Sequence, residues 1–301
     1  MESPAKPEVR VRGVQPDDID FLCEFLQSGF SKSGIPAAGW RALFDYTWRP
    51  DSSDPGLVLT VDGAIVGFLG TICVCRELRG KSVLLCNCSS WYVRPEHRNL
   101  SLALLSAAHR DRRLTYTNFT PNSLTVQMLK RMGFRPLAAR RFILPPLSNA
   151  ETLLAPPPLI SFAPETVYRL IDESQRRIFD DHARYDCLQG VVVDGKDHAY
   201  LVAKRRLWRL RPMTRLLAAG AGLPYSLLLH CSAPAILARH LERIKLALLV
   251  QQRTVLLAAD EHVFPTPPRG FHRTKPTWYR SDDLHPGDLD GLYSELVLLP
   301  L

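Results

Sequence analysis

Residues 91–105 combine basic and small side chains in a spacing suited to binding an anion. The segment reads Trp-Tyr-Val-Arg-Pro-Glu-His-Arg-Asn-Leu-Ser-Leu-Ala-Leu-Leu, which is typical of a strand, a turn and then a helix. A helix that begins in such a turn directs its unpaired backbone N–H groups and its positive dipole end at the preceding loop. Because phosphate groups bind at such helix starts, the sequence predicts an anion site here.

The order of residues in this segment resembles the pyrophosphate-binding signature of the GNAT acyltransferases. That signature is Arg or Gln, two residues, Gly, one residue, then Gly or Ala. Arg98 fills the first place and Ala103 the last, and Ser101 stands where the central Gly is usual. Asn122, followed eleven residues later by Gly-Phe, looks like the second signature of the same family. Together the two segments imply a GNAT domain in the first half of the chain.

The resemblance implies that an acyl-CoA lies in an opening between the strand that ends at Val93 and a strand over 114–119. Backbone groups of the first strand would hold the pantetheine, and the amides of 99–103 would hold the pyrophosphate with help from the charge of Arg98. Acetyl-CoA or another acyl-CoA is the cofactor implied. The implied cofactor-binding residues are Trp91, Val93, Arg98, Asn99, Leu100, Ser101, Leu102, Ala103 and Asn122.

Acyl transfer needs one group that takes a proton from the acceptor and another that protonates the leaving thiolate. Many GNAT enzymes carry a carboxylate at the places of Ser89 and Ser90, and a tyrosine at the place of Leu129. Since both customary groups are missing, we expect ordered water to relay the protons. The expected catalytic residues are Ser90, Tyr116 and Asn118, with His97 as a further candidate. The aromatic residues expected to shape the acceptor site are Trp40, Tyr46 and Trp48.

A chain of 301 residues has room for two domains. We expect a GNAT acyl-CoA-binding domain over 1–145, a proline-rich linker over 146–158 and a second, degenerate GNAT-like domain over 159–301. The helices and strands expected in the second half, ending in a strand over 292–299, repeat the element order of the first half coarsely. The predicted fold class is therefore α/β (α+β), with tandem GNAT-like mixed sheets flanked by helices and no cofactor in the second half.

The formal net charge of +8 favours an anionic partner. The strongest basic cluster is 204–211, but no nucleic-acid-binding motif surrounds it, so we expect no nucleic acid; an acyl carrier protein and a homodimer stay open as partners. The first residues lack the apolar run of a secretory signal, and no apolar stretch is long enough to cross a bilayer. The sequence predicts a cytoplasmic protein with no membrane span.

Four of the seven cysteines form two Cys-x-Cys pairs that flank a turn. A two-residue turn at Gly80-Lys81 would pair Cys75 with Cys86 and Cys73 with Cys88, and all four side chains would share one face of the sheet. Zinc sites usually separate paired cysteines by two or more residues and enclose the ion tetrahedrally. We expect these cysteines to be small buried residues and to hold no metal.

These observations favour an acyl-CoA-dependent acyltransferase, an N-acetyltransferase, that moves an acyl group to an amine or hydroxyl of a small-molecule acceptor. Two alternatives stay open. The departures at Ser89, Ser90 and Leu129 suit a non-catalytic acyl-CoA-binding regulatory module, and the positive charge suits an acyltransferase that uses an acyl carrier protein as its donor.

Overall fold

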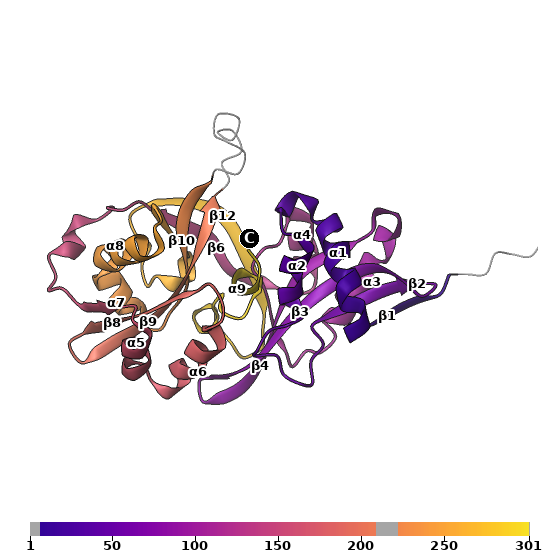
Figure 1. The fold of residues 1–301 in the computed structure, drawn as a ribbon, viewed down its shortest axis with the longest axis horizontal. Coiled ribbons are helices and arrows are strands. Elements are labelled where there is room, and N and C mark those ends of the chain that lie inside the picture. Colours follow the sequence, from indigo (N-terminus) through magenta and orange to yellow (C-terminus); the bar gives the residue numbers. More distant parts are fainter. Residues whose placement is uncertain (1–6, 209–221, 301) are drawn as a thin grey trace, which may run out of the picture. The chain divides into compact units, whose positions relative to one another are not determined.

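The structure, a computed structural model, describes residues 7–208 and 222–300. These residues form two compact units. Unit 1 consists of the described chain up to Arg135 together with 278–284 and the residues from 293 onward, and unit 2 consists of 136–277 and 285–292. Each unit is a mixed β-sheet with helices packed on it (Figure 1), so the predicted α/β class is confirmed.

The sheet of unit 1 takes five strands from the first half of the chain. In spatial order they are β1 (Val9–Gly13), β2 (Gly56–Val61), β3 (Ala64–Leu78), β4 (Lys81–Val93) and β5 (Thr115–Asn118), followed by the last three residues of β12 (Phe271–Arg280). Strands β1 to β4 are antiparallel to their neighbours. Strand β5 runs parallel to β4, as a strand–helix–strand connection requires.

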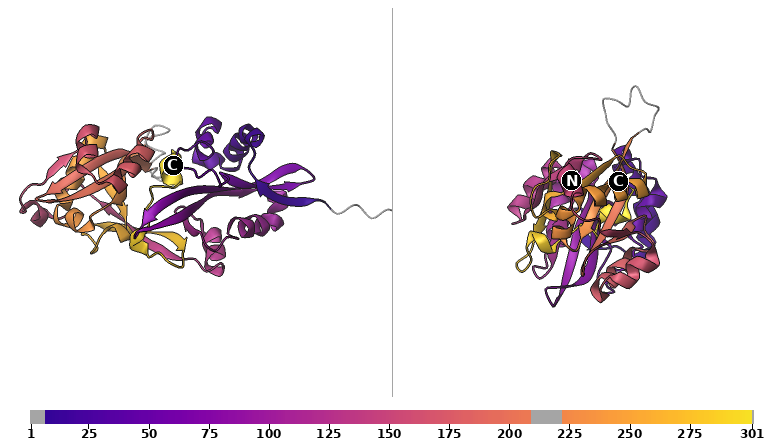
Figure 2. Two further views of the ribbon diagram at one scale, coloured as in Figure 1. Left: turned by 90° about the horizontal axis from the view of Figure 1, so that it is seen from below. Right: turned by 90° about the vertical axis from the view of Figure 1, so that its left-hand side faces the viewer.

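Helices cover both faces of this sheet, as the side view in Figure 2 shows. One face carries α1 (Ile19–Gly29), α2 (Ala37–Trp40) and α9 (Glu295–Leu298), and the other carries α3 (Ser101–Ala108) and α4 (Ser123–Arg131). Short 3-10 helices precede or link them: Pro16–Asp18, Ser31–Ser33, Arg41–Leu43 and Pro95–Leu100. The order strand, two helices, three strands, helix, strand, helix is the order that the GNAT resemblance implies.

The hairpin between β3 and β4 turns one residue earlier than predicted. Arg79 and Gly80 both have positive φ, 54° and 72°, as a two-residue type I′ turn demands. The register therefore shifts by two, which places Cys73 opposite Cys86 instead of opposite Cys88. An even shift leaves every side chain on its face, so the predicted sharing of one face by the cysteines is correct.

The sequence pattern from Trp40 to Trp48 predicts a helical piece, but the helix ends at Leu43, where a single 3-10 turn closes it. Its aromatic residues are core residues: Trp40, Tyr46 and Trp48 are 2%, 6% and 7% exposed. The hydroxyl of Tyr46 donates to the carbonyl of Thr71 and accepts from the amide of Cys73, so it pairs backbone groups of β3 that have no strand partner on that side. All three aromatic residues are thus packed in the interior, as aromatic residues at helical spacing usually are.

The sheet of unit 2 contains β6 (Arg135–Leu144), β11 (Leu256–Asp260), β10 (Leu223–Cys231), β9 (Asp197–Trp208), β8 (Leu188–Asp194) and β7 (Leu159–Ser161), in that spatial order. Its helices are α5 (Pro164–Leu170), α6 (Glu173–His182), α7 (Pro234–Arg239) and α8 (Leu241–Gln252). The element order of unit 2 repeats that of β2 to β5 in unit 1. Three antiparallel strands are followed by helices and then by a strand that is parallel to the third strand.

Three details of unit 2 and of the C-terminal segment differ from the sequence expectations. The sequence pattern does not predict strands β7, β8 and β12, and the strand predicted over 292–299 is instead the short helix α9. A further strand predicted over 215–219 lies outside the described residues. The basic cluster lies partly outside the described residues, but within it Lys204 and Arg206 are only 7% and 4% exposed. Arg205, which lies between them in β9, is exposed, so one of the three described basic side chains of the cluster faces solvent.

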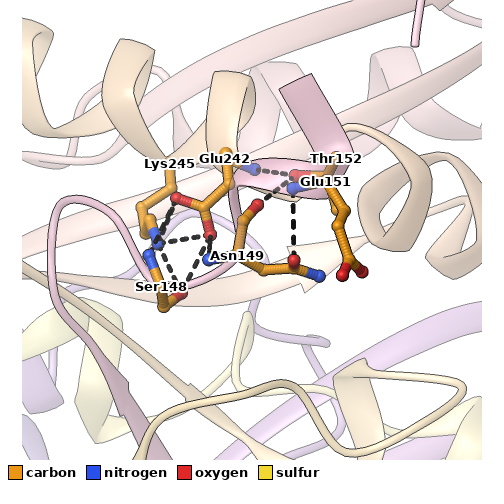
Figure 3. A network of polar contacts seen from close by, with 6 residues as sticks. All are labelled: Ser148, Asn149, Glu151, Thr152, Glu242 and Lys245. Atoms are coloured by element: carbon orange, nitrogen blue, oxygen red, sulfur yellow. Dashed lines mark hydrogen bonds and ion pairs between the residues drawn. The ribbon is translucent and has the colours of Figure 1, made fainter. Parts of the chain in front are cut away.

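The proline-rich stretch expected as a linker is packed into unit 2. Glu242 and Lys245 of α8 form an ion pair that is wholly buried. Ser148 donates its hydroxyl and its amide to the Glu242 carboxylate, and the amide of Asn149 donates to it as well (Figure 3). This network, with Thr152 bonded to the first turn of α8, fixes the stretch against the helix.

Candidate active site

Part of the edge of β4 has no neighbouring strand in the region where the sequence predicts the site. Backbone pairing between β4 and β5 covers only Leu85–Asn87 and Thr115–Thr117, whereas β4 continues to Val93. At the first unpaired position the side-chain amide of Asn118 donates to the carbonyl of Cys88 at 2.8 Å. The Asn118 side-chain carbonyl is buried and accepts no hydrogen bond from any described residue. The opening therefore begins with an unused buried acceptor.

Two residues beyond this point, β4 contains a bulge at Ser90. Ser90 has φ of 56°, in the left-handed region that non-glycine residues rarely adopt, and the pairing of β4 with β3 shifts register there. The hydroxyls of Ser89 and Ser90 lie 3.0 Å apart. A bulge re-aims the peptide groups of its strand, so the N–H groups near Ser90 are released from regular ladder pairing.

A carboxylate that was not predicted lies at the same opening. The hydroxyl of Thr120 donates to Glu295 at 2.6 Å, and the amide of Glu295 donates to the side chain of Asn87 at 3.4 Å. Asn87 in turn donates to the hydroxyl of Thr117 at 3.2 Å. Because Asn87 ends the paired part of β4 and Thr120 follows β5, Glu295 lies where the two strands separate. It is 1% exposed.

The segment expected as an open phosphate-binding loop is a 3-10 helix, Pro95–Leu100, that runs directly into α3. The amide of His97 donates to the carbonyl of Arg94, and the amide and hydroxyl of Ser101 both donate to the carbonyl of Arg98. These donors are used inside the chain and do not face a ligand. Among the features expected to bind the phosphate groups, the guanidinium of Arg98 is exposed and available to a ligand.

Four of the other residues expected to bind the cofactor have packing or capping roles. Val93 is buried against α3, and Trp91 and Leu100 pack on the same apolar cluster. The side chain of Asn122 accepts a hydrogen bond from the amide of Thr125 at 2.9 Å, so it is the N-cap of α4. Asn99, Leu102 and Ala103 are exposed.

The three residues expected to relay protons are not joined to one another. Among the described residues, no hydrogen bond links Ser90, Tyr116 and Asn118 in any pairing. Tyr116 is 1% exposed, and burial raises its pKa above the ordinary value. Its ring packs 4.8 Å from that of His109, under the guanidinium of Arg280. Tyr116 thus belongs to the core between the sheet and α3.

Across 7–208 and 222–300, no group of three or more His, Cys, Asp or Glu side chains is arranged to hold a metal ion. Over the same residues, no helix is both long enough and apolar enough to cross a bilayer.

The sequence matches no protein-family model, and it matches no curated protein. Solved structures do resemble it. A GCN5-related N-acetyltransferase from Anabaena variabilis has a TM-score of 0.55 at 11% identity, over 91% of this chain and 72% of that one. A GCN5-related N-acetyltransferase from Kribbella flavida has a TM-score of 0.54 at 10% identity, over 94% of this chain and 73% of that one. Eis1 from Mycobacterium abscessus has a TM-score of 0.51 at 15% identity, over 91% of this chain and 74% of that one. The chain has the fold of the GCN5-related N-acetyltransferases.

Proposed function

We propose that this protein is an acyltransferase that takes its acyl group from a pantetheine thioester and passes it to an amine or hydroxyl acceptor in the cytoplasm. The observation that carries the proposal is the opening between β4 and β5, with a bulge at Ser90 and a buried carboxylate, Glu295, beside it. An unpaired strand edge offers N–H and C=O groups to an amide-rich chain such as pantetheine. The fold, which is similar to that of acetyltransferases, also supports a role in acyl transfer.

Within this proposal the residues of the chain have separate tasks. The unpaired edge of β4 from Cys88 onward would bind and orient the donor, and N–H groups near Ser90 would stabilise negative charge on the thioester oxygen. Glu295 would take the proton that the acceptor nitrogen or oxygen loses. The donor itself supplies the activated acyl group. Holding donor and acceptor side by side would supply much of the acceleration.

The fit of coenzyme A to this site is incomplete. The edge of β4 suits the pantetheine, but the amides of His97 and Ser101 are occupied inside the 3-10 helix. Binding a pyrophosphate there would require this helix to open. With CoA as donor, Arg98 would therefore make an electrostatic contact to the cofactor, and no cradle of amides would bind the pyrophosphate.

The closed helix favours a second candidate donor. A carrier protein presents its acyl group on phosphopantetheine, which has a single phosphodiester and no adenosine diphosphate, so it needs no pyrophosphate cradle. The formal charge of +8 suits an acidic carrier surface. An acyltransferase that uses an acyl carrier protein is thus favoured by one specific feature, the occupied amides of His97 and Ser101.

The test compares donors on the full-length chain. Acetyl-CoA, acetyl-phosphopantetheine and acetylated carrier protein are each supplied with a panel of amines and alcohols, and thiol release and acetylated product are measured by mass spectrometry. A charge reversal at Arg98 should weaken use of acetyl-CoA about tenfold, as loss of a charged contact does, and should leave acetyl-phosphopantetheine unaffected. Arg112→Glu, at another exposed arginine beyond α3, is the matched control. No product with any donor, together with retained CoA binding, would favour the non-catalytic regulatory module.

A further inference from the structure

The helices on the two faces of the unit 1 sheet belong to segments of opposite net charge. Residues 94–135, which contain α3 and α4, include eight basic and two acidic residues, a net charge of +6. Residues 14–55, which contain α1 and α2, include three basic and seven acidic residues, a net charge of −4. The α3–α4 face, the face of the sheet that carries these two helices (Figure 2), is therefore the one that would attract an anionic partner.

The positive charge of the α3–α4 face is accessible. All eight basic side chains of residues 94–135 are exposed. Three of them follow α3 and two end α4: Arg110, Arg112, Arg113, Lys130 and Arg131. Among the described residues, the only ion pair that any of the eight forms is Arg113–Asp111, at 2.7 Å. Most of these charges are therefore available to a partner.

Two exposed leucines lie on the same face, beside the opening between β4 and β5. Leu102 is the second residue of α3 and Leu124 the second residue of α4, and they are 53% and 58% exposed. Since α3 follows β4, α4 follows β5, and these two strands are parallel, both helices begin at one edge of the sheet. At that edge β4 continues without a partner, so the leucines lie on the helix starts that border the opening.

Helices α3 and α4 form one continuous surface. Met128 and Met132, in and just after α4, pack on the apolar cluster that contains Leu104 and Leu105 of α3. The inner sides of both helices are thereby fixed to one core, and their outer sides present the exposed leucines and basic side chains together. A partner that binds one helix start would also contact the other.

The proposed base approaches the opening from the opposite face. Glu295 belongs to α9, which lies with α1 and α2 on the other side of the sheet (Figure 2). A donor on the α3–α4 face would therefore leave the side of Glu295 to the acceptor. This separation allows the donor to be as large as a protein.

An acidic protein suits the α3–α4 face better than a nucleic acid does. Apolar side chains surrounded by charged ones are typical of protein–protein interfaces, which have an apolar centre and a polar rim. A nucleic-acid backbone is bound mainly through its phosphates, by basic and polar groups. Such a partner would make no use of Leu102 and Leu124, whereas an acidic protein would use both the leucines and the basic side chains.

On the basis of the acyl-transfer function proposed above, on which this assignment rests, we propose that the α3–α4 face is the docking surface of an acyl carrier protein. Leu102 and Leu124 contact apolar side chains of the carrier, and the basic residues around them contact its acidic surface. The phosphopantetheine arm enters between the two helix starts and lies along the unpaired edge of β4 toward Ser90.

The first experiment measures docking without the arm. The full-length chain is titrated calorimetrically with an acidic acyl carrier protein in its apo form, which lacks phosphopantetheine. Leu102→Asp and Leu124→Asp should each weaken binding about tenfold, as loss of an apolar contact near the centre of an interface does. Both variants should fold, because an acidic residue in the first turn of a helix is favourable. Val250→Asp, at a 77% exposed residue of α8 in unit 2, is the matched control.

A charge variant tests the rim of the same surface. Lys130→Glu should slow association with the carrier about threefold and reduce its dependence on salt, since rim charges act mainly on the association rate. Lys32→Glu, at an exposed lysine between α1 and α2, should leave both unchanged. Equal binding of the carrier by the parent chain, Leu102→Asp and Leu124→Asp would overturn the proposal. A duplex RNA that binds more tightly than the carrier, and equally to the parent chain and Leu124→Asp, would also overturn it.

Turnover separates docking from acyl transfer. Leu124→Asp should lower kcat/KM with acetylated carrier about tenfold, in line with the lost contact, and keep the parent rate with free acetyl-phosphopantetheine. If the parent chain uses free acetyl-phosphopantetheine or acetyl-CoA but binds no carrier, the docking surface is refuted and acyl transfer stands. If the carrier binds the parent chain and Leu124→Asp weakens that binding, but no donor is turned over, the docking surface stands and acyl transfer is refuted.

Discussion

The hydroxyl of Thr120 donates a 2.6 Å hydrogen bond to the carboxylate of Glu295, a residue 175 positions further along the chain. This bond joins the end of β5 to the first turn of α9 within unit 1. It brings a buried carboxylate to the strand opening, where the sequence around Ser90 offers only hydroxyls. The acid–base chemistry proposed here depends on that long-range contact.

Replacing Glu295 by Gln should slow acyl transfer by about 10²–10⁴-fold if its carboxylate is the base, since that is the usual contribution of general-base catalysis. Gln keeps the size and can still accept from Thr120. The rate of product formation should fall while donor binding, measured by calorimetry, stays unchanged. Glu77→Gln, an exposed carboxylate on β3, is the control. Full activity in the Glu295 variant would mean that ordered water, and not Glu295, takes the proton from the acceptor.

Ser90 tests whether the bulge acts through its backbone or its hydroxyl. A non-glycine residue in the left-handed region costs about 1–2 kcal/mol, so Ser90→Gly should not weaken the fold and should keep the N–H groups in place. We expect Ser90→Gly to retain acyl transfer within about tenfold, the loss of one relay member, and Ser90→Val to be destabilised. Thermal melts and product formation measure both effects. A Gly variant that is stable but inactive by several orders of magnitude would make the hydroxyl indispensable.

The buried pair Arg141–Asp260 should contribute to the acid sensitivity of unit 2. Burial alone would raise the pKa of Asp260, but the charge of Arg141 lowers it below the ordinary value. The pair is thus stabilising above the unfolded-state pKa of about 3.9, and that stability is lost as the pH falls through the folded-state pKa.

Asp260→Asn should destabilise the protein by about 3–5 kcal/mol at pH 7, because it leaves a buried guanidinium without its counter-charge. The difference from the parent chain should shrink as the pH approaches 3. Urea melts at the two pH values measure it. An equal difference at both would mean that packing and not charge is responsible.

The network in Figure 3 allows a double-mutant cycle at the buried pair Glu242–Lys245. Lys245→Met should cost about 3–5 kcal/mol because it leaves a buried carboxylate without its partner. Adding Glu242→Leu should recover part of that loss, since an apolar pair needs no counter-charge, but should free the stretch around Ser148. Limited proteolysis near residue 150 together with urea melts measures both. A double variant less stable than either single variant would contradict this account.

Local signals predicted much of unit 1, because the elements concerned are set by neighbouring residues. Asn122 caps α4 through Thr125, three residues away, and the helix forms where the sequence pattern indicates. The register of the β3–β4 hairpin could not be fixed in the same way. Both Gly80-Lys81 and Arg79-Gly80 place a glycine in a two-residue turn, and the pattern of apolar faces is identical for the two.

The candidate site was less predictable because its decisive groups come from distant parts of the chain. The carboxylate of Glu295 is placed by Asn87 and Thr120, and nothing in the local sequence around it indicates those contacts. The expected amide cradle depended on an open loop, but Pro95 starts a helix, and the amides that follow are used by i to i+3 bonding.

The division of the chain between the units also sets the order in which the two units can be completed during synthesis. Unit 1 needs 278–284 and 293–299, whereas unit 2 needs nothing after residue 292. During synthesis, which proceeds from the N-terminus, the unit that is made first is therefore the last to acquire its full core. Until then the edge of β5 and the opening beside Asn87 lack Trp278 and Glu295, so the proposed acyl-transfer site cannot form before residue 295 has been made.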